Sequence, residues 1–225
     1  MLKALMYEIQ YENYSPDFSM YETLLDINIP VIEFGSGTGR ITNHLLQKGY
    51  TVFGIEKDED YKKYFIHKIQ AKPFADRFRY IKDIRDVSAI CNIIYPFNVF
   101  FYLSEKDVRL ELNKLQNHYF NLLIIDTDNI FTLKNNNLSK KEHATKEFCF
   151  KEQSLLKKTK VIIQCEVLKG EELILKFKYH LYLHKADFLL SLYEKHFKKF
   201  KLYGDFNMNN YDGYSNKLIA VIKQK

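Results

Sequence analysis

Three of the eight glycines in this 225-residue chain lie within five residues, and an acid stands two residues before the first of them. The segment reads Glu33-Phe34-Gly35-Ser36-Gly37-Thr38-Gly39-Arg40. Glycine has no Cβ, so it tolerates positive φ and lets a ligand approach the backbone closely. The spacing is neither the GxGxxG of a dinucleotide site nor a P-loop, and the Glu33 carboxylate suits an ammonium group better than a phosphate. The segment therefore predicts a nucleotide-type site that also binds a cation.

The elements around the glycines form a strand, a helix and a second strand. Residues 29–34 are a short apolar run, residues 40–48 have a helical apolar face, and residues 51–56 form a second apolar run. Such a βαβ unit has parallel strands and a right-handed crossover, so both strands end at the same edge of the sheet. Glu33 and Glu56 are therefore expected at one edge.

The rest of the first half continues the same alternation. We expect a helix at 60–71, strands at 78–82, within 95–103 and at 122–127, and a helix that opens at Ser104. Ser104 can cap that helix, and the acids that follow it favour the positive helix end. The pattern is that of an α/β protein.

After Asn129 the pattern changes to one expected for an antiparallel cover. Residues 133–139 are polar and predict a loop, while 148–150, 160–168 and 173–182 are β-rich, with a hairpin turn at 169–171. A helix at 185–200 and strands at 201–206 and 218–222 complete the pattern. The main sheet would then have seven strands.

With these elements in place, the sequence resembles the class I S-adenosylmethionine-dependent methyltransferases. Their (D/E)xGxGxG signature is matched by Glu33 and the three glycines, and acids after the second and third strands by Glu56 and Asp83. A fourth-strand motif is matched by Pro96-Phe97-Asn98-Val99. The resemblance implies a Rossmann-like, mostly parallel seven-stranded sheet with helices on both faces, plus a small antiparallel cover after the fifth strand.

The resemblance also implies a cofactor, S-adenosylmethionine, which leaves as S-adenosylhomocysteine. Glu33 would bind the methionine ammonium, Glu56 the two ribose hydroxyls, and Asp83 the adenine amino group. Taken alone, Glu56 could equally be a surface acid and Asp83 a turn residue. The expected cofactor-binding set is Tyr21, Glu33, Gly35, Ser36, Gly37, Gly39, Arg40, Glu56, Lys57, Asp83, Ile84, Phe97 and Asn98.

The small-molecule branch of these enzymes is the part of the family that the sequence resembles most. It implies a single domain over 1–225, divided into a lid (1–28), a cofactor-binding half (29–132), the cover (133–184) and a last helix with a terminal hairpin (185–225). Tyr14 is the expected catalytic residue, orienting the acceptor or the methyl group; simple packing is the alternative. The expected acceptor-binding residues are Tyr11, Tyr102, Asp126 and Asn129.

Two other functions remain open from the sequence. The net charge of +6 and the basic run Phe197–Lys201 would suit an RNA methyltransferase. However, Tyr95-Pro96-Phe97-Asn98 is not the (D/N)PP(Y/F) motif of the enzymes that methylate adenine amino groups, and the lysines are scattered, so we expect no nucleic-acid partner. The third hypothesis is a non-catalytic subunit that binds the cofactor.

Metal, redox and membrane roles are not favoured. Three cysteines without CxxC spacing predict neither zinc nor disulfides. The Asp126-Thr127-Asp128-Asn129 cluster could hold a hard cation, but its place after a strand favours the acceptor pocket, so we expect no metal. No apolar run reaches the roughly 18 residues of a membrane span, and a cytoplasmic location is expected. The oligomeric state stays open, with a homodimer as one option.

Overall fold

The computed structural model describes residues 1–130 and 138–224 and contains two sheets. The main sheet has seven strands in the order β10-β11-β5-β4-β1-β2-β3. Neighbours among β1 to β5 pair in parallel, whereas β11 is antiparallel to both β5 and β10. The strands are β1 (Val31–Phe34), β2 (Val52–Ile55), β3 (Phe78–Tyr80), β4 (Asn92–Tyr95), β5 (Leu122–Asp128), β10 (Phe200–Tyr203) and β11 (Lys217–Lys223). This architecture confirms the expected fold class.

Helices cover both faces of the main sheet because successive strand residues point to opposite sides. Val31, Ile94 and Ile124 pack with α2 (Phe18–Leu24), α3 (Arg40–Gln47) and α4 (Glu59–Ile69). Their chain neighbours Ile32, Ile93 and Ile125 pack with α5 (Glu105–Gln116) and α6 (Ala186–His196). Three short 3-10 helices, η1 (Ala75–Arg77), η2 (Ile84–Asp86) and η3 (Val99–Tyr102), complete this half.

The fourth strand lies earlier than the sequence predicted. A strand within 95–103 was expected, but β4 ends at Tyr95 and residues 99–102 form η3. Phe97 and Asn98 both take positive φ, which ends the extended chain. The expectation was wrong because a short aromatic run has the same composition in a buried strand as in a buried helical turn. Here Phe100 and Phe101 are buried in a helical turn.

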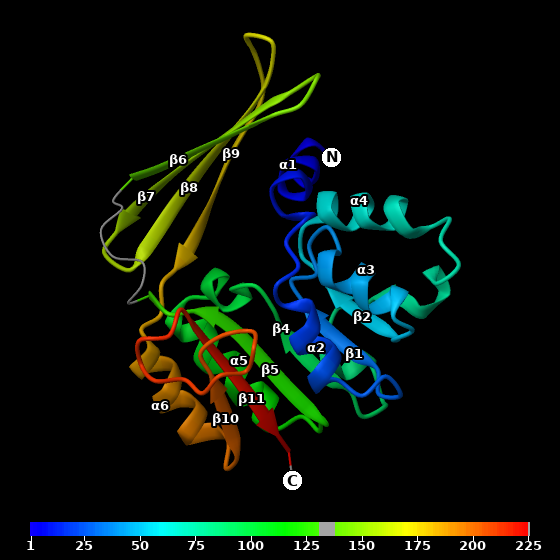
Figure 1. The fold of residues 1–225 in the computed structure, drawn as a ribbon, viewed down its shortest axis with the longest axis vertical. Helices are drawn as coiled ribbons and strands as arrows, with labels where there is room; N and C mark the ends of the chain where they lie inside the picture. The colour runs from blue at the N-terminus through cyan, green and yellow to red at the C-terminus, as the bar shows by residue number, and fades with distance from the viewer. Residues whose placement is uncertain (131–137, 225) are drawn as a thin grey trace.

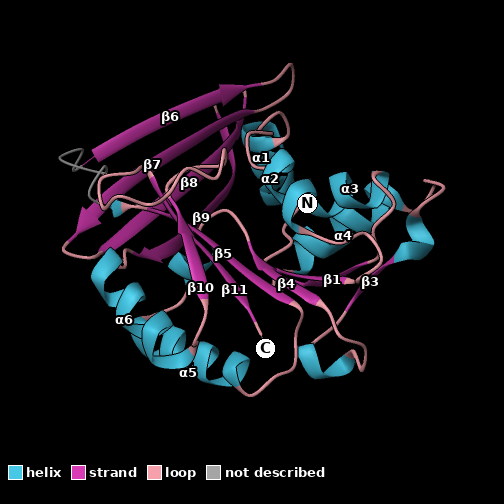
Figure 2. Cartoon of the chain, turned by 60° about the horizontal axis from the view of Figure 1, so that its bottom comes forward, coloured by secondary structure: helices cyan, strands magenta, loops and turns pink. Residues whose placement is uncertain are grey.

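The second sheet is antiparallel, in the order β6-β7-β8-β9 (Figure 2). Its strands are β6 (Leu138–Ala144), β7 (Cys149–Lys157), β8 (Lys160–Lys169) and β9 (Glu172–Tyr182). The cover is thus confirmed, but with four strands instead of the three that were predicted. The loop expected at 133–139 lies outside the described residues except for its last two residues, which belong to β6.

Helix α1 (Leu2–Tyr11) lies between the antiparallel sheet and α4 (Figure 1). Its apolar side, including Leu5 and Met6, packs against Phe150 and Val167 of the sheet face that we call the inner face. Its polar side forms an ion pair from Glu8 to Lys68 of α4. Helix α1 is therefore attached both to the antiparallel sheet and to α4, which covers the main sheet. No helix among the described residues is long and apolar enough to cross a membrane.

Candidate functional site

The three glycines between β1 and α3 all take positive φ but differ in their surroundings. A Cβ at Gly35 would lie 2.7 Å from Val99, and one at Gly39 would lie 2.1 Å from the Phe65 ring. Both glycines are therefore required by internal packing. A Cβ at Gly37 would meet no atom closer than 3.8 Å. Gly37 is itself buried, with the Gly35 carbonyl and the Tyr7 ring at ordinary contact distances, so its positive φ of 56° requires the glycine there more than packing does.

Glu33 lies beneath this loop and is 2% exposed. Its carboxylate accepts a hydrogen bond from the Thr42 hydroxyl at 2.5 Å. Burial raises the pKa of Glu33 to about 8, against the lowering effects of that hydrogen bond and of Arg40. Within the described residues Glu33 forms no ion pair. A buried carboxylate of this kind is suited to a cationic ligand.

Arg40 joins the glycine loop to the N-terminal segment. Its guanidinium donates to both carboxylate oxygens of Asp17, at 2.7 and 2.6 Å, and to the Tyr14 carbonyl at 2.8 Å. Asp17 is fully buried, and the pair holds the pKa of Arg40 above its usual range. The bidentate pair thus fixes the start of α2 and the Tyr14 backbone against the loop.

Glu56 follows β2 and points at the same loop. One carboxylate oxygen accepts the Gly37 amide at 2.9 Å, and the other accepts the amides of Lys57 and Asp58, both at 2.8 Å. Lys57 therefore contributes its main chain here, while its side chain is exposed. The structure brings Glu33, Gly37 and Glu56 together at the carboxyl edge of the main sheet, as expected for adjacent parallel strands.

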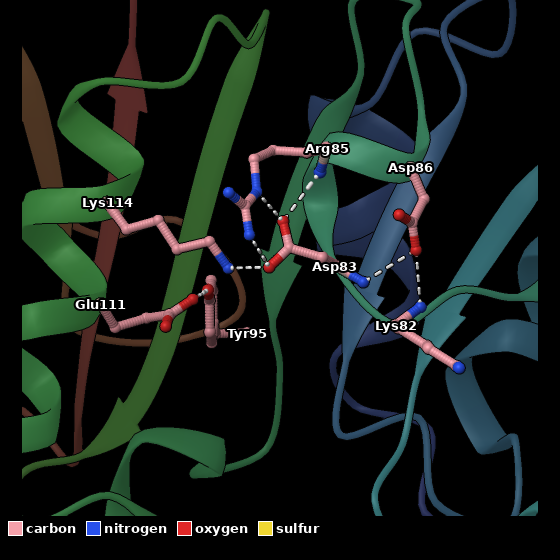
Figure 3. Close-up of polar contacts among 7 residues, drawn as sticks. All are labelled: Lys82, Asp83, Arg85, Asp86, Tyr95, Glu111 and Lys114. Atoms are coloured by element: carbon pink, nitrogen blue, oxygen red, sulfur yellow. Dashed lines mark hydrogen bonds and ion pairs between the residues drawn. The ribbon is translucent and has the colours of Figure 1, made fainter.

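Asp83 caps η2, and its carboxylate is already occupied by cations (Figure 3). One oxygen accepts from the Arg85 backbone and Nε, at 3.0 and 2.8 Å, and the other accepts from Lys114 at 2.8 Å. These partners, Arg85 first, hold the pKa of Asp83 well below its usual range. Ile84 is fully buried beside it. An adenine amino group at Asp83 would have to share an oxygen with one of the two cations.

The end of β4 is strained and firmly held. Phe97 and Asn98 have φ of 49° and 64°, an unfavourable pair of values for residues other than glycine. The Phe97 amide donates to Asp126 at 3.0 Å, and the Asn98 amide group pairs with Asp128 at 2.8 and 2.5 Å. Strain maintained in this way is characteristic of ligand sites.

The turn places the Phe97 ring among predicted site residues. Its centroid lies 5.0 Å from that of Tyr11 and 5.1 Å from that of Tyr14. Arg40 lies 5.1 Å from the same ring. Tyr14 is half-buried, and burial raises its pKa. Its hydroxyl forms no hydrogen bond with any residue in the described part, so it is available to a ligand.

Asp126 and Asn129, predicted to bind the acceptor, make internal contacts instead. Asp126 lies 3.1 Å from the Lys217 ammonium, which also lies 2.8 Å from Asp128. The Asn129 amide donates to the Gly213 and Ser215 carbonyls, both at 3.0 Å. These residues thus support the strained turn and the C-terminal loop; a further role toward an acceptor stays a prediction.

A row of tyrosine rings leads from the glycine loop toward the antiparallel sheet. The Tyr7 ring lies 3.9 Å from the Cβ position of Gly37, and its centroid is 4.8 Å from that of Tyr11 and 5.7 Å from that of Tyr61. Tyr102 is 52% exposed, yet desolvation is the main cause of its raised pKa. The Tyr102 ring also stacks on Tyr179 of β9, with centroids 6.0 Å apart.

Tyr21 and Ser36, two predicted cofactor residues, are buried. The Tyr21 hydroxyl is in the core beside α3 and has no hydrogen-bond partner in the described part of the chain. Burial raises its pKa well above the usual value, with smaller contributions from Asp126 and Asp17. Sequence reasoning missed Asp17, Lys217 and Tyr7, because each meets the site through tertiary contacts that no local motif marks.

Two other features do not coincide with this site. No group of three or more His, Cys, Asp or Glu side chains in residues 1–130 and 138–224 could hold a metal ion. A polar recess of about 420 Å³ lies on the antiparallel sheet and is lined by residues of β6, β7 and β8. None of the site residues predicted from the sequence borders it, although Glu152 of β7 does.

Comparison with known proteins bears on the fold. No protein-family model matches the sequence. An uncharacterized methyltransferase from Geobacillus sp. is 42% identical over 57 residues, 23% of this chain. The match spans about a quarter of that relative, 27% of its length.

Solved structures match over nearly the whole chain. The CcbJ methyltransferase from Streptomyces caelestis has a TM-score of 0.76 at 18% identity, covering 93% of this chain and 90% of that one. CalS10, an amino pentose methyltransferase from Micromonospora echinaspora solved with S-adenosylmethionine, has a TM-score of 0.70 at 10% identity, covering 100% and 97%. At these identities the likeness shows the fold, which is that of S-adenosylmethionine-dependent methyltransferases.

Proposed function

We propose that this protein is an S-adenosylmethionine-dependent methyltransferase that moves a methyl group to nitrogen or oxygen of a small-molecule acceptor. The observation that carries the proposal is the buried Glu33 carboxylate, which forms no ion pair within the described residues and lies beside the glycine loop at the carboxyl edge of the main sheet. A methionine ammonium group supplies the missing charge, and the glycine lets the rest of that moiety pass close to the backbone.

The other residues of the edge fit the remainder of the cofactor. Glu56 is fixed by three backbone amides and can accept the ribose hydroxyls. Arg40 and Asp17 hold the loop from below, and Ile84 with Asp83 would border the adenine. S-adenosylmethionine supplies a methyl group already activated by a positively charged sulfur.

The chain's own task is then to position the acceptor and exclude water. The Tyr7, Tyr11 and Phe97 rings close the glycine loop from the side of α1, and the free Tyr14 hydroxyl can orient the acceptor or the methyl group. In this proposal residues 1–28 act as the lid, 29–132 hold the cofactor, and 133–184 cover the acceptor. No strong base is required, since solvent can take the acceptor's proton.

Calorimetric titration with S-adenosylmethionine and S-adenosylhomocysteine tests the proposal. We expect micromolar, one-to-one binding of both compounds, and a loss of about tenfold or more on Gly37→Ala. Gly170→Ala is the matched control, because Gly170 also has positive φ (61°) and no atom within 4 Å of its Cβ position. Equal losses in the two variants, or wild-type protein that gives no heat, would refute the proposal. A screen of small amines and alcohols for cofactor-dependent methylation then identifies the acceptor.

A further inference from the structure

The inner face of the antiparallel sheet carries a buried carboxylate that the proposed cofactor site does not use. Glu152 on β7 is 8% exposed. Its contacts are the Gln10 side-chain amide and the Tyr179 hydroxyl, each at 3.5 Å, the outer limit of a hydrogen bond. Within the described residues Glu152 forms no ion pair. Its carboxylate is thus removed from water and accepts only two long hydrogen bonds in place of its hydration.

Neither Lys141 nor Lys3 forms an ion pair with Glu152 within the described residues. Lys141 lies opposite Glu152 in the β6–β7 register, but its side chain is exposed to solvent. Lys3 on α1 forms its ion pair with Asp58. Burying a carboxylate without a cation is unfavourable, so a cation from outside the chain would relieve the cost.

Tyrosine rings gather around the same carboxylate. The Tyr179 and Tyr102 rings stack with centroids 6.0 Å apart. Burial raises the pKa of Tyr11 to about 12, and the Glu152 charge is the next cause; the same charge raises the pKa of Tyr102 and Tyr179. Aromatic faces combined with a carboxylate are a favourable environment for an organic cation.

This cluster is continuous with the proposed cofactor site. Tyr11 contacts Tyr7, whose ring stands over Gly37, and it also contacts Phe97 at the end of β4. Tyr102 of η3 is half-exposed. A ligand held at Glu152 and Tyr102 therefore lies on the acceptor side of the glycine loop.

We propose that Glu152, with the rings of Tyr11, Tyr102 and Tyr179, binds the ammonium group of the methyl acceptor, which is accordingly an amine that is cationic at neutral pH. The identification of the bound amine as the methyl acceptor rests on the proposed function. The cation site itself does not depend on it. Glu152 is a specificity-determining residue in this account: it selects a charged amine over a neutral molecule of the same shape.

The test compares cyclohexylamine with cyclohexanol, two probes of similar shape and different charge. Each is titrated by ligand-observed NMR at pH 7 into the full chain, with and without S-adenosylhomocysteine. We expect wild-type protein to bind the amine about tenfold more tightly than the alcohol. Glu152→Gln removes the preference, and Tyr179→Phe, which keeps the ring, reduces it by about twofold. Glu166→Gln is the matched control, since Glu166 lies on the neighbouring strand β8 and pairs with Lys176 at 2.7 Å.

The outcomes separate the two proposals. Equal binding of the two probes by wild-type protein, or a preference that survives Glu152→Gln, overturns the amine site even when S-adenosylhomocysteine binds normally. Loss of the preference in Glu152→Gln but not in Glu166→Gln supports it, including the case where S-adenosylhomocysteine fails to bind and the proposed function falls. Unchanged S-adenosylhomocysteine affinity, and a cooperative thermal unfolding transition no lower than that of the wild type, exclude misfolding of Glu152→Gln as the cause.

Discussion

The carboxyl edge of the main sheet and the inner face of the antiparallel sheet both hold buried carboxylates, but they hold them differently. At the edge, Glu56 accepts three backbone amides and Asp17 accepts two short hydrogen bonds from Arg40. On the inner face, Glu152 has two contacts of 3.5 Å. At the edge, Asp17 and Glu56 are fixed before any ligand arrives and Glu33 lacks a cation within the described residues, whereas the inner face holds its buried carboxylate by long contacts alone.

Under the two proposals, this difference separates a region that binds a constant ligand, the cofactor, from one that binds a variable ligand, the acceptor. A cofactor has one shape, so a preorganised set of donors and acceptors binds it at little cost in ordering. An acceptor pocket made of rings and one carboxylate selects by charge and size. The following variants test this contrast, from the largest expected effect to the smallest.

Asp17→Ala is expected to have the largest effect. It leaves the Arg40 guanidinium, 7% exposed, without its partner, which costs about 3–5 kcal/mol of unfolding free energy. The counterpart on the antiparallel sheet is Glu147→Ala, whose pair with Lys169 is more than half exposed and contributes at most about 1 kcal/mol. Urea unfolding measures both. Similar losses in the two variants would contradict the contrast.

Glu33→Gln tests the pH dependence of stability that the buried Glu33 carboxyl group is expected to cause. Burial raises the pKa of Glu33 to about 8, from the roughly 4.5 of an exposed glutamate, so the protonated form is favoured in the folded state. The stability that Glu33 contributes is present below about pH 4.5 and is lost as the pH rises through about 8, up to about 4 kcal/mol between pH 5 and 8. Unfolding curves at several pH values should show this fall in wild-type protein and a flatter profile in Glu33→Gln. Glu166→Gln should keep the wild-type slope.

Gly39→Ala compares a glycine that packs against a ring with Gly170, which has no atom near its Cβ position. A Cβ at Gly39 would overlap the Phe65 ring at 2.1 Å, and the φ of Gly39 is 79°, so overpacking and backbone strain together cost about 2–4 kcal/mol. Gly170→Ala on the antiparallel sheet carries only the strain, about 1 kcal/mol. Thermal unfolding compares them, and a Gly39→Ala protein as stable as Gly170→Ala would show that the loop is less rigid than described.

Glu152→Gln is expected to give the smallest effect, and in the opposite direction. Replacing an unsatisfied buried carboxylate by a neutral amide of the same shape should stabilise the protein by about 1 kcal/mol. Chemical denaturation measures the gain. A loss of stability would instead mark Glu152 as a structural residue.

The sequence predicted the parts of the site that are encoded locally. The glycine spacing and the acid before it marked Gly37 and Glu33, and the βαβ pattern brought Glu56 to the same edge. These contacts depend on residues close in sequence or on adjacent parallel strands, so local pattern was sufficient.

The features that were missed depend on partners far away in the chain. Lys217 meets Asp126 through the last strand, and Glu152 meets Tyr179 and Gln10 through the antiparallel sheet and α1. The polar strand β6 has no apolar alternation to mark it, because it is the edge strand of that sheet. Tertiary packing alone decides these positions.

A crystal structure with S-adenosylhomocysteine tests the central claim most directly. The account predicts the homocysteine amino group beside Glu33, its backbone against Gly37, and the ribose hydroxyls on Glu56. Ligand bound elsewhere, or a complex in which Glu33 and Gly37 touch no ligand atom, would contradict the account.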